Sequence, residues 1–299
     1  PGRGDRTRSA PPQCLNRSYD TGSIDNPPVF RLSIRMSRIA SCLILSLLTV
    51  INSWGNTDTN YLAGFTWPVG EKLTYKLYWG VIPVGSAVVW TEWADFEGQR
   101  LLAIRLRTVS NKVIEKIYPV NDVIESLIDP TTFLPVQFTK NMSEGSRRHH
   151  EITRFDRINR VANWESKITK ETRIFKIDAD TRDIPSFMYF MRNQRFAPGK
   201  RDHFKVMADE KIYDLWITAY KNESVDLPGY DPMECIKIEP EAAFNGLFVR
   251  KGRMWAWISN DPRCLAARVE ASIPVANVRA VLISVEGPGQ DFWVTPKKQ

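Results

Sequence analysis

The chain has 299 residues, with 41 Lys and Arg against 34 Asp and Glu, and a formal net charge of +7 at pH 7. Residues 1–55 hold seven of these basic residues and three of the acidic ones, so residues 56–299 carry a net charge of only +3. This weak charge gives little support to nucleic acid or an anionic membrane as a partner. The densest basic stretch, residues 146–150, is interpreted as the cap of a solvated turn.

Residues 36–55 have the pattern of a secretory signal peptide. Met36 and Arg38 lead into an apolar run of thirteen residues, Ile39–Ile51, and small residues follow at the positions that a signal peptidase reads. The alternative is a membrane anchor, but this run is shorter than the roughly 20 apolar residues that cross a bilayer. We therefore expect export, with cleavage after Gly55.

Two terminal segments are set apart from the predicted domain. Residues 1–35 begin with Pro1 and show no hydrophobic periodicity. They are explained either as translated upstream sequence or as a disordered extension, which their composition also permits. Residues 288–299 form a polar tail. No Pro/Gly/Ser-rich linker divides the rest, so we predict a single β-rich domain over residues 62–287.

Alternation of apolar and polar residues dominates this domain and is typical of half-buried β-strands. Leu73, Tyr75, Leu77 and Trp79 share one face of the first predicted strand. The same period recurs in RLLAIRLRT and AARVEASI. Glycine-containing turns separate such strands about every 8–12 residues, which indicates an antiparallel meander.

One helix is predicted, at residues 184–195. Pro185 suits its first turn, and Phe187, Phe190 and Met191 recur at helical spacing. It is the only segment in which a helical period replaces the period of two.

Acidic residues just before this helix are the best candidates for acid–base chemistry. They are Asp178, Asp180 and Asp183. Carboxylates near a helix N-terminus are favoured by the helix dipole and by capping, so a structural role is the preferred interpretation. Asp261, which precedes Pro262, is likewise expected to form a turn.

The sequence contains no pattern of a catalytic, metal or cofactor site. His149 and His150 are adjacent, so in a strand they would face opposite sides and would not both ligate one metal ion. His203 is the only other histidine. Neither a Gly-x-Ser-x-Gly elbow nor a glycine-rich phosphate loop occurs. We predict no catalytic residues, no metal and no cofactor.

Residues 65–93 carry a resemblance to a known family. A Gly-Glu pair opens a strand containing Leu-x-Tyr, and a second glycine follows a short hydrophobic turn. This layout resembles the start of domain of unknown function 3108, a family of exported bacterial proteins. The matching positions are Gly70, Glu71, Leu73, Tyr75 and Gly85. Three later segments are similar to the same family: residues 155–164, 183–200 and 248–270.

The resemblance implies a curved antiparallel sheet or an incomplete β-barrel, which the alternation supports independently. It also implies a bacterium with two membranes, so that the exported protein would lie in the periplasm, at the outer membrane or in the medium. The family assigns no catalytic residues, and structural roles are expected for the motif residues. For Glu71 we favour hydrogen bonding at the strand edge over a buried functional role. This chain departs from the family pattern at Cys264-Leu265, where a proline is expected. The motif residues with structural roles are Gly70, Glu71, Tyr75, Gly85 and Asp261.

Tryptophan is abundant in the predicted domain. In RMWAWIS, Trp255 and Trp257 occupy one strand phase and Met254, Ala256 and Ile258 the other, so we expect this strand to be covered on both sides. The aromatic rings either fill a core or line a cleft for a lipid-like or hydrophobic ligand. The candidates for ligand contact are Trp79, Trp90, Trp255 and Trp257.

Two cysteines, Cys235 and Cys264, lie in the predicted domain, and export would place them where disulfides form. Cys235 shares a strand phase with Lys237 and Cys264 shares one with Arg268, so both are expected on polar faces. The sequence leaves open a disulfide between them and a pair of free thiols.

Two classes of function follow. The first is a non-catalytic, exported cell-envelope protein that binds a hydrophobic ligand or an envelope partner on a curved β-sheet. The alternative is a hydrolase or transferase acting on an envelope polymer, which predicts convergent polar side chains with a perturbed pKa. The absence of nucleophile and metal motifs favours the first. We expect neither nucleic acid as a partner nor a transmembrane span in the mature chain.

Overall fold

The computed structural model describes residues 69–208, 210–241, 253–272 and 277–287. All of them belong to one unit of the chain, Asn56–Gln299. The predicted signal peptide at residues 36–55, the segment before it and the polar tail at residues 288–299 lie outside the described residues.

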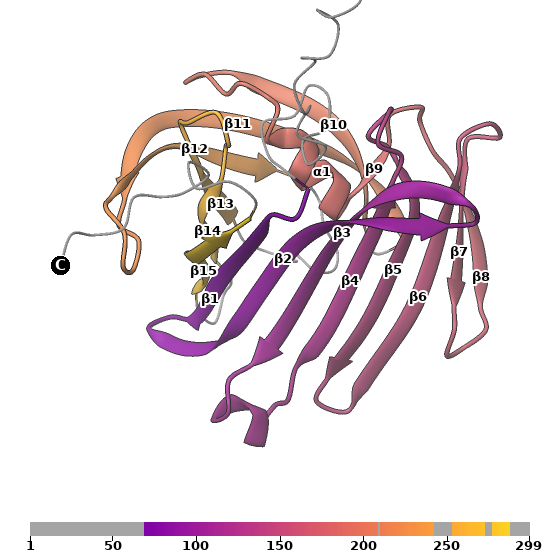
Figure 1. Ribbon diagram of the computed structural model, residues 1–299, viewed down its shortest axis with the longest axis horizontal. Coiled ribbons are helices and arrows are strands. Elements are labelled where there is room, and N and C mark those ends of the chain that lie inside the picture. Colours follow the sequence, from indigo (N-terminus) through magenta and orange to yellow (C-terminus); the bar gives the residue numbers. More distant parts are fainter. Residues whose placement is uncertain (1–68, 209, 242–252, 273–276, 288–299) are drawn as a thin grey trace, which may run out of the picture. The chain divides into compact units, whose positions relative to one another are not determined.

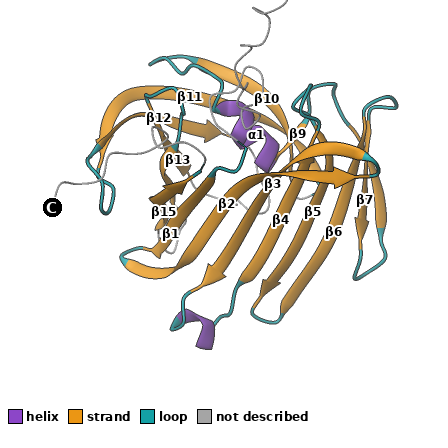
Figure 2. Cartoon of the chain, viewed as in Figure 1, coloured by secondary structure: helices purple, strands orange, loops and turns teal. Residues whose placement is uncertain are grey.

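Fifteen strands form one sheet (Figure 2). They are β1 (Lys72–Trp79), β2 (Ile82–Phe96), β3 (Gln99–Ser110), β4 (Asn121–Ile128), β5 (Pro135–Glu144), β6 (Arg147–Asp156), β7 (Val161–Ser166), β8 (Thr172–Lys176), β9 (Arg182–Asp183), β10 (Arg201–Ala208), β11 (Lys211–Val225), β12 (Met233–Glu241), β13 (Arg253–Ser259), β14 (Ala266–Ser272) and β15 (Asn277–Glu286). Strands β1 to β8 form one half of the sheet as a meander, β9 to β15 form the other half, and β1 pairs with β15 between them (Figure 1). The order ends at β8 and β9, so the sheet is open. The predicted antiparallel, incomplete barrel is confirmed.

Strand β1 shows how alternation builds the inner face of the sheet. Leu73 and Tyr75 are buried and Lys76 is exposed, as predicted. The register with β15 shifts between Thr74 and Tyr75, and the register with β2 shifts further along β1. Such bulges rotate the side chains that follow. Trp79, predicted to share the face of Leu73, is instead 50% exposed at the strand end.

Strand β3 departs from the predicted alternation because four successive residues are buried. Leu102 and Ile104 belong to the main core, whereas Leu101 and Ala103 pack with Leu127 of β4 in a smaller cluster. Successive strand residues point to opposite faces, so this small cluster covers the second face of the sheet.

The backbone conformation explains why glycine occupies two positions of the family motif. Gly70 has a φ of 101° in the turn before β1, a conformation that L side chains rarely adopt. At Gly85, β2 and β3 approach so closely that a Cβ atom would lie 2.2 Å from the carbonyl oxygen of Val109. A side chain therefore does not fit at Gly85 without moving one of the strands.

Helix α1 (Ile184–Met191) begins where predicted and ends at Met191 rather than at residue 195. Asp183 is its N-cap and Pro185 lies in its first turn, which confirms the capping interpretation. The helix contacts β3 and β4 of one half of the sheet and β9 and β10 of the other (Figure 1). It therefore links the two halves.

Side chains, not backbone pairing, connect the two edges of the sheet. Phe155 of β6 and Ala162 of β7 pack with Met207 of β10 in one buried cluster. Arg173 of β8 forms an ion pair with Glu210, which lies between β10 and β11. The incomplete barrel is thus bridged at its open side by an apolar contact and a charged one.

Candidate functional site

Two apolar cavities lie against helix α1, and each has a volume of about 180 Å³. The first is lined by α1, strands β2 to β7 and β10, and the second by α1, β1, β2 and strands β10 to β14. Both are bounded by Val89, Ile184, Met188 and Tyr189, so the helix is their common wall.

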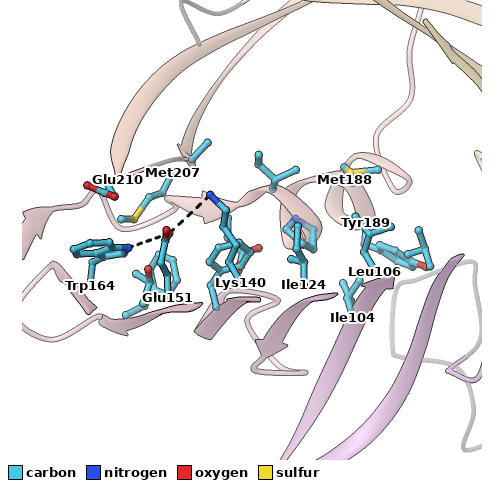
Figure 3. A pocket seen from close by; sticks show the side chains of 18 residues that line it. Ile104, Leu106, Ile124, Lys140, Glu151, Trp164, Met188, Tyr189, Met207 and Glu210 are labelled. Atoms are coloured by element: carbon cyan, nitrogen blue, oxygen red, sulfur yellow. Dashed lines mark hydrogen bonds and ion pairs between the residues drawn. The ribbon is translucent and has the colours of Figure 1, made fainter. Parts of the chain in front are cut away.

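The wall of the first cavity is apolar over most of its length (Figure 3). Ile104 and Leu106 of β3 and Ile124 of β4 point into it beside Met188 of the helix. The three strand residues come from two strands that are consecutive in the chain and paired in the sheet. The polar residues that border this cavity are Lys140, Glu151, Thr153, Asp183 and Glu210.

A charged cluster lies at the end of the first cavity away from Ile104 and Leu106 (Figure 3). Glu151 accepts a hydrogen bond from Nε1 of Trp164 at 3.3 Å, and its carboxylate lies 3.8 Å from Nζ of Lys140. The side chains of Lys140 and Glu151 are each only 12% exposed. We define the charged cluster as Lys140, His149, Glu151, Glu171, Arg173 and Glu210.

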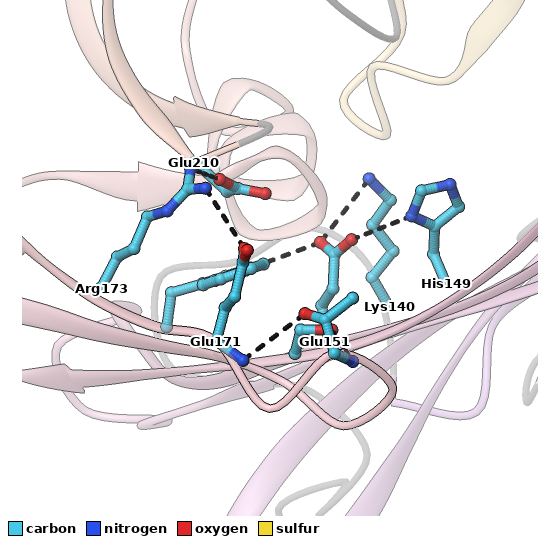
Figure 4. Close-up of polar contacts among 9 residues, drawn as sticks. Lys140, His149, Glu151, Glu171, Arg173 and Glu210 are labelled. Atoms are coloured by element: carbon cyan, nitrogen blue, oxygen red, sulfur yellow. Dashed lines mark hydrogen bonds and ion pairs between the residues drawn. The ribbon is translucent and has the colours of Figure 1, made fainter.

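The remaining members of the charged cluster extend it across the open side of the sheet (Figure 4). Nδ1 of His149 lies 3.3 Å from the Glu151 carboxylate. Arg173 forms ion pairs with both Glu171 and Glu210, and its guanidinium lies 5.3 Å from the centre of the Trp164 ring. Groups of both signs therefore meet at the polar end of an apolar cavity.

The second cavity is bordered by side chains from α1, from β1 and β2, and from strands β10 to β14. Phe187 and Met191 of the helix face Leu215 and Ile217 of β11 and Ala256 of β13 across it. Its one charged lining residue is Arg192. The second cavity is consequently the more hydrophobic of the two.

Arg192 holds the end of α1 to the start of β1 through a buried ion pair. Its guanidinium contacts both carboxylate oxygens of Glu71, with Nη2 to Oε2 at 2.9 Å, and Tyr189 donates a hydrogen bond from its hydroxyl to Oε1 at 3.3 Å. Glu71 is fully buried. The backbone of Glu71 forms the hydrogen bond expected at the strand edge, since its carbonyl oxygen accepts from the N–H of Thr91 at 3.0 Å, and its side chain adds a buried ion pair with the helix.

The electrostatics of this network follow from its burial. Burial acts to lower the pKa of Arg192, but the Glu71 carboxylate outweighs it and holds that pKa above its ordinary value. Burial raises the pKa of Tyr75, a motif residue beside the network, and burial and Glu71 together raise that of Tyr189. Both phenols therefore remain protonated, and Arg192 remains charged.

Asp183 borders the first cavity, but its side chain caps the N-terminus of α1. Its Oδ1 accepts hydrogen bonds from the backbone N–H and Oγ of Ser186, at 2.8 and 2.6 Å, and its Oδ2 accepts one from Oγ of Ser126 at 2.6 Å. Burial raises the pKa of Asp183 despite these hydrogen bonds. Both carboxyl oxygens of Asp183 therefore accept structural hydrogen bonds within the protein.

None of the four candidate tryptophans borders either cavity. Met254, Ala256 and Ile258, which alternate along β13, line the second cavity. Trp255 and Trp257 occupy the alternate positions of the same strand. Trp257 is buried and donates from Nε1 to a Glu223 carboxylate oxygen at 2.7 Å. The expectation that this strand is covered on both sides is confirmed. Trp90 is half buried and Trp79 half exposed.

Cys235 and Cys264 are free thiols in the structure, the second of the two arrangements that the sequence left open. Both are buried, so the expectation of polar faces was wrong. Cys235 packs in the main core, where burial raises its pKa to about 12. Cys264 lies in the turn before β14, where Asp261 accepts a hydrogen bond from the backbone N–H of Arg263 at 2.8 Å, as its predicted turn role requires.

Other polar candidates do not combine into a metal site. His203 contacts the Asp214 carboxylate at 2.6 Å, away from His149. Among the residues that the structure describes, no three His, Cys, Asp or Glu side chains are grouped so as to hold a metal ion. The described part of the chain also has no helix whose length and apolar character would suit a membrane span.

The sequence did not reveal the polar residues of the site. Lys140, Glu151 and Trp164 come from three different strands, and Arg192 meets Glu71 across 121 residues. The alternation of Phe138 and Lys140 on one strand face was a weak signal, because a lysine on an inward-facing phase is unusual.

Comparisons with known proteins agree with this architecture. No curated protein matches the chain. Its structure is similar to the crystal structure of a beta-barrel-like protein of domain of unknown function DUF1849 from Brucella abortus, with a TM-score of 0.53 and 9% sequence identity, over 74% of this chain and 99% of the other. That likeness concerns the fold alone. The model of the family described as "Protein of unknown function (DUF3108)" matches residues 74–283, most of the chain, and the protein therefore belongs to the DUF3108 family.

Proposed function

We propose that the protein is an exported, non-catalytic binding protein that holds a lipid-like or hydrophobic ligand in the two cavities beside α1. The observation that carries this proposal is the pair of apolar cavities that share the wall of Val89, Ile184, Met188 and Tyr189. Ligand sites are typically concave and mostly apolar, with a few polar groups that fix orientation.

The size and arrangement of the cavities indicate the ligand class. Each cavity, at about 180 Å³, is larger than an engineered apolar cavity of roughly 150 Å³ that binds benzene. Two such cavities on a common wall suit a ligand with more than one apolar segment. The charged cluster at one end of the first cavity suits a polar end group, so an amphiphile fits better than a pure hydrocarbon.

The enzymatic alternative receives less support from the geometry. Among the carboxyl groups that border the cavities, Asp183 has a pKa raised by burial, but its two carboxyl oxygens are occupied by Ser186 in the first turn of α1 and by Ser126 of β4. Glu151 is held by Trp164, His149 and Lys140. Neither carboxyl is presented as a free acid or base in a polar cleft.

Native mass spectrometry of the full chain, purified from a bacterial host without added lipid, tests this proposal. We expect a fraction of the protein to carry a fixed added mass, which denaturing solvent extraction identifies as a lipid-like molecule. Bare protein that remains bare after incubation with envelope lipids would overturn the proposal.

The pattern of residues 36–55 supports export, which N-terminal sequencing of the secreted product tests.

A further inference from the structure

The β1–β2, β3–β4 and β5–β6 connections lie at one end of the sheet (Figure 1), and they carry exposed apolar side chains. Val81 is 88% exposed and Ile117 is 80% exposed. Large hydrophobic side chains that gather on a surface while so exposed to solvent often mark an interaction site. More than half of the exposed large hydrophobic side chains among the described residues gather at this end. We call this surface the apolar tip and define it by Trp79, Val81, Ile82, Val113, Ile117, Tyr118 and Val278.

The apolar tip is continuous because its loops are joined to one another. Trp79 pairs with Val278 across β1 and β15. The β1–β2 turn directly follows Trp79. Strand β2 is joined to the β3–β4 loop by a hydrogen bond from the backbone N–H of Asn111 to the carbonyl oxygen of Val84, at 2.9 Å. The tip is therefore one surface built by residues far apart in the sequence.

The β5–β6 turn extends this end of the sheet further. The backbone N–H of Gly145 donates to the carbonyl oxygen of Pro119 at 2.8 Å. The ring of Tyr118 lies directly over Gly145, where a Cβ atom would approach it to 2.8 Å. Arg148 caps the turn by donating to the Gly145 carbonyl oxygen, also at 2.8 Å. The basic stretch at residues 146–150 thus begins in a solvated turn, as the sequence indicated, but it also borders the apolar tip.

Positive charge surrounds the apolar tip. Lys112 and Lys116 flank Val113 and Ile117 in the β3–β4 loop, which contains the 3-10 helix η1 (Ile114–Lys116). The exposed acidic residue of this loop is Glu115. The basic side chains around the tip are Lys112, Lys116, Arg147 and Arg148, all of them exposed. Arg147 lies opposite Glu144 in the β5–β6 hairpin, and Arg148 donates to backbone carbonyl oxygens.

Apolar side chains, an exposed Trp and Tyr, and exposed Lys and Arg are the combination that binds at the headgroup level of a bilayer. Aromatic side chains settle at the membrane–water interface, and basic side chains there gain from anionic lipids. A protein partner would also cover apolar side chains, but Lys112, Lys116, Arg147 and Arg148 outnumber the acidic Glu115 and Glu144 around the tip, and this excess of positive charge favours an anionic surface. We propose that the apolar tip docks the protein onto the surface of an anionic lipid bilayer. This proposal does not depend on the cavities.

Vesicle cosedimentation of the full chain tests this proposal. The vesicles are phosphatidylcholine alone or equal parts of phosphatidylcholine and phosphatidylglycerol. The first variant combines Val81→Asp with Ile117→Asp, and its matched control is Ile158→Asp, because Ile158 is 94% exposed in the β6–β7 turn at the opposite end of the sheet. The second variant combines Lys112→Glu with Lys116→Glu. All proteins share the same N-terminal segment, so differences between them report on the tip.

We expect the unaltered protein to bind the anionic vesicles at least about tenfold more tightly than the neutral ones, and each double variant to lose about tenfold or more of that binding. The Ile158→Asp control should bind as the unaltered protein does. Equal binding to both kinds of vesicle, or equal losses in the variants and the control, would overturn the proposal. Circular dichroism of each variant verifies folding, and an empty ligand cavity would leave the result unchanged.

Discussion

Arg192, the C-cap of helix α1, forms a buried ion pair with Glu71, which lies immediately before β1 and 121 residues away in the sequence. Helix α1 is the common wall of both cavities, so this pair anchors the wall to the strand that joins the two halves of the sheet. Two charges removed from water are costly to separate, because the survivor remains buried without compensation.

Replacing Glu71 by Gln should therefore destabilise the protein strongly. We expect the free energy of unfolding to fall by about 3–5 kcal/mol, the range found when one partner of a buried ion pair is removed. Urea denaturation measures the change. The matched control is Lys72→Gln, since the ion pair of Lys72 with Glu286 is exposed to solvent and such pairs contribute little.

A double variant separates the ion pair from the packing of the helix. Glu71→Leu combined with Arg192→Met removes both charges and keeps most of the apolar volume, so it should be more stable than Glu71→Gln alone. If the double variant were the less stable of the two, the buried charges would not be the source of the loss.

The local pattern of the sequence was sufficient for elements whose structure depends on near neighbours. The alternation of Leu73 and Tyr75 with Lys76 predicted the inner face of β1, and Pro185 after Asp183 predicted where α1 begins and how it is capped. Both signals act within a few residues, where side-chain period and capping chemistry decide the conformation.

The site itself depends on register and long-range pairing, which no local pattern encodes. Trp255 and Trp257 occupy one strand phase and Met254 and Ala256 the other, and both phases are apolar, so nothing in the sequence shows which phase faces the cavity. The basic residues of the apolar tip are likewise distributed over separate loops. Composition therefore gave little indication of a membrane-docking surface, and the proposal of one rests on the adjacency of the loops.

The pH dependence of stability should report the burial of Asp183. Burial raises its pKa in the folded protein above the value in the unfolded chain, so the folded state binds its proton more tightly. The stability gained from this tighter proton binding is complete at pH values below the pKa of Asp183 in the unfolded chain. It is lost as the pH rises through the pKa of Asp183 in the folded protein. Urea unfolding of the unaltered protein and of Asp183→Asn, between pH 3 and pH 7, measures it.

In that comparison the unaltered protein should lose stability relative to Asp183→Asn as the pH rises, because the neutral amide cannot ionise. Asn is also a good N-cap, so the start of the helix is preserved. A stability difference that stays constant over this range would show that the Asp183 carboxyl does not titrate differently in the folded and unfolded chains.

Gly85→Ala should force β2 and β3 apart. The added Cβ atom would lie 2.2 Å from the Val109 carbonyl oxygen, and backbone atoms cannot give way as a flexible side chain does. We expect a loss of about 1–3 kcal/mol in thermal or urea unfolding, as for other overpacked sites. Gly80→Ala is the control, with open space around its Cβ but a φ of +58°, and should cost about 1 kcal/mol. Equal costs would mean that close approach is unimportant at Gly85.

Filling the second cavity should reduce ligand binding without altering the charged cluster. Ala256 is buried in β13 and lines this cavity, so Ala256→Phe places a ring where the ligand would lie. Titration with the fluorescent apolar probe N-phenyl-1-naphthylamine should show at least about tenfold weaker binding, a change of about 1.4 kcal/mol. Ile174→Phe is the control, because Ile174 is 71% exposed on the edge strand β8 and borders neither cavity. Unchanged binding in a folded Ala256→Phe variant would place the apolar ligand outside the second cavity.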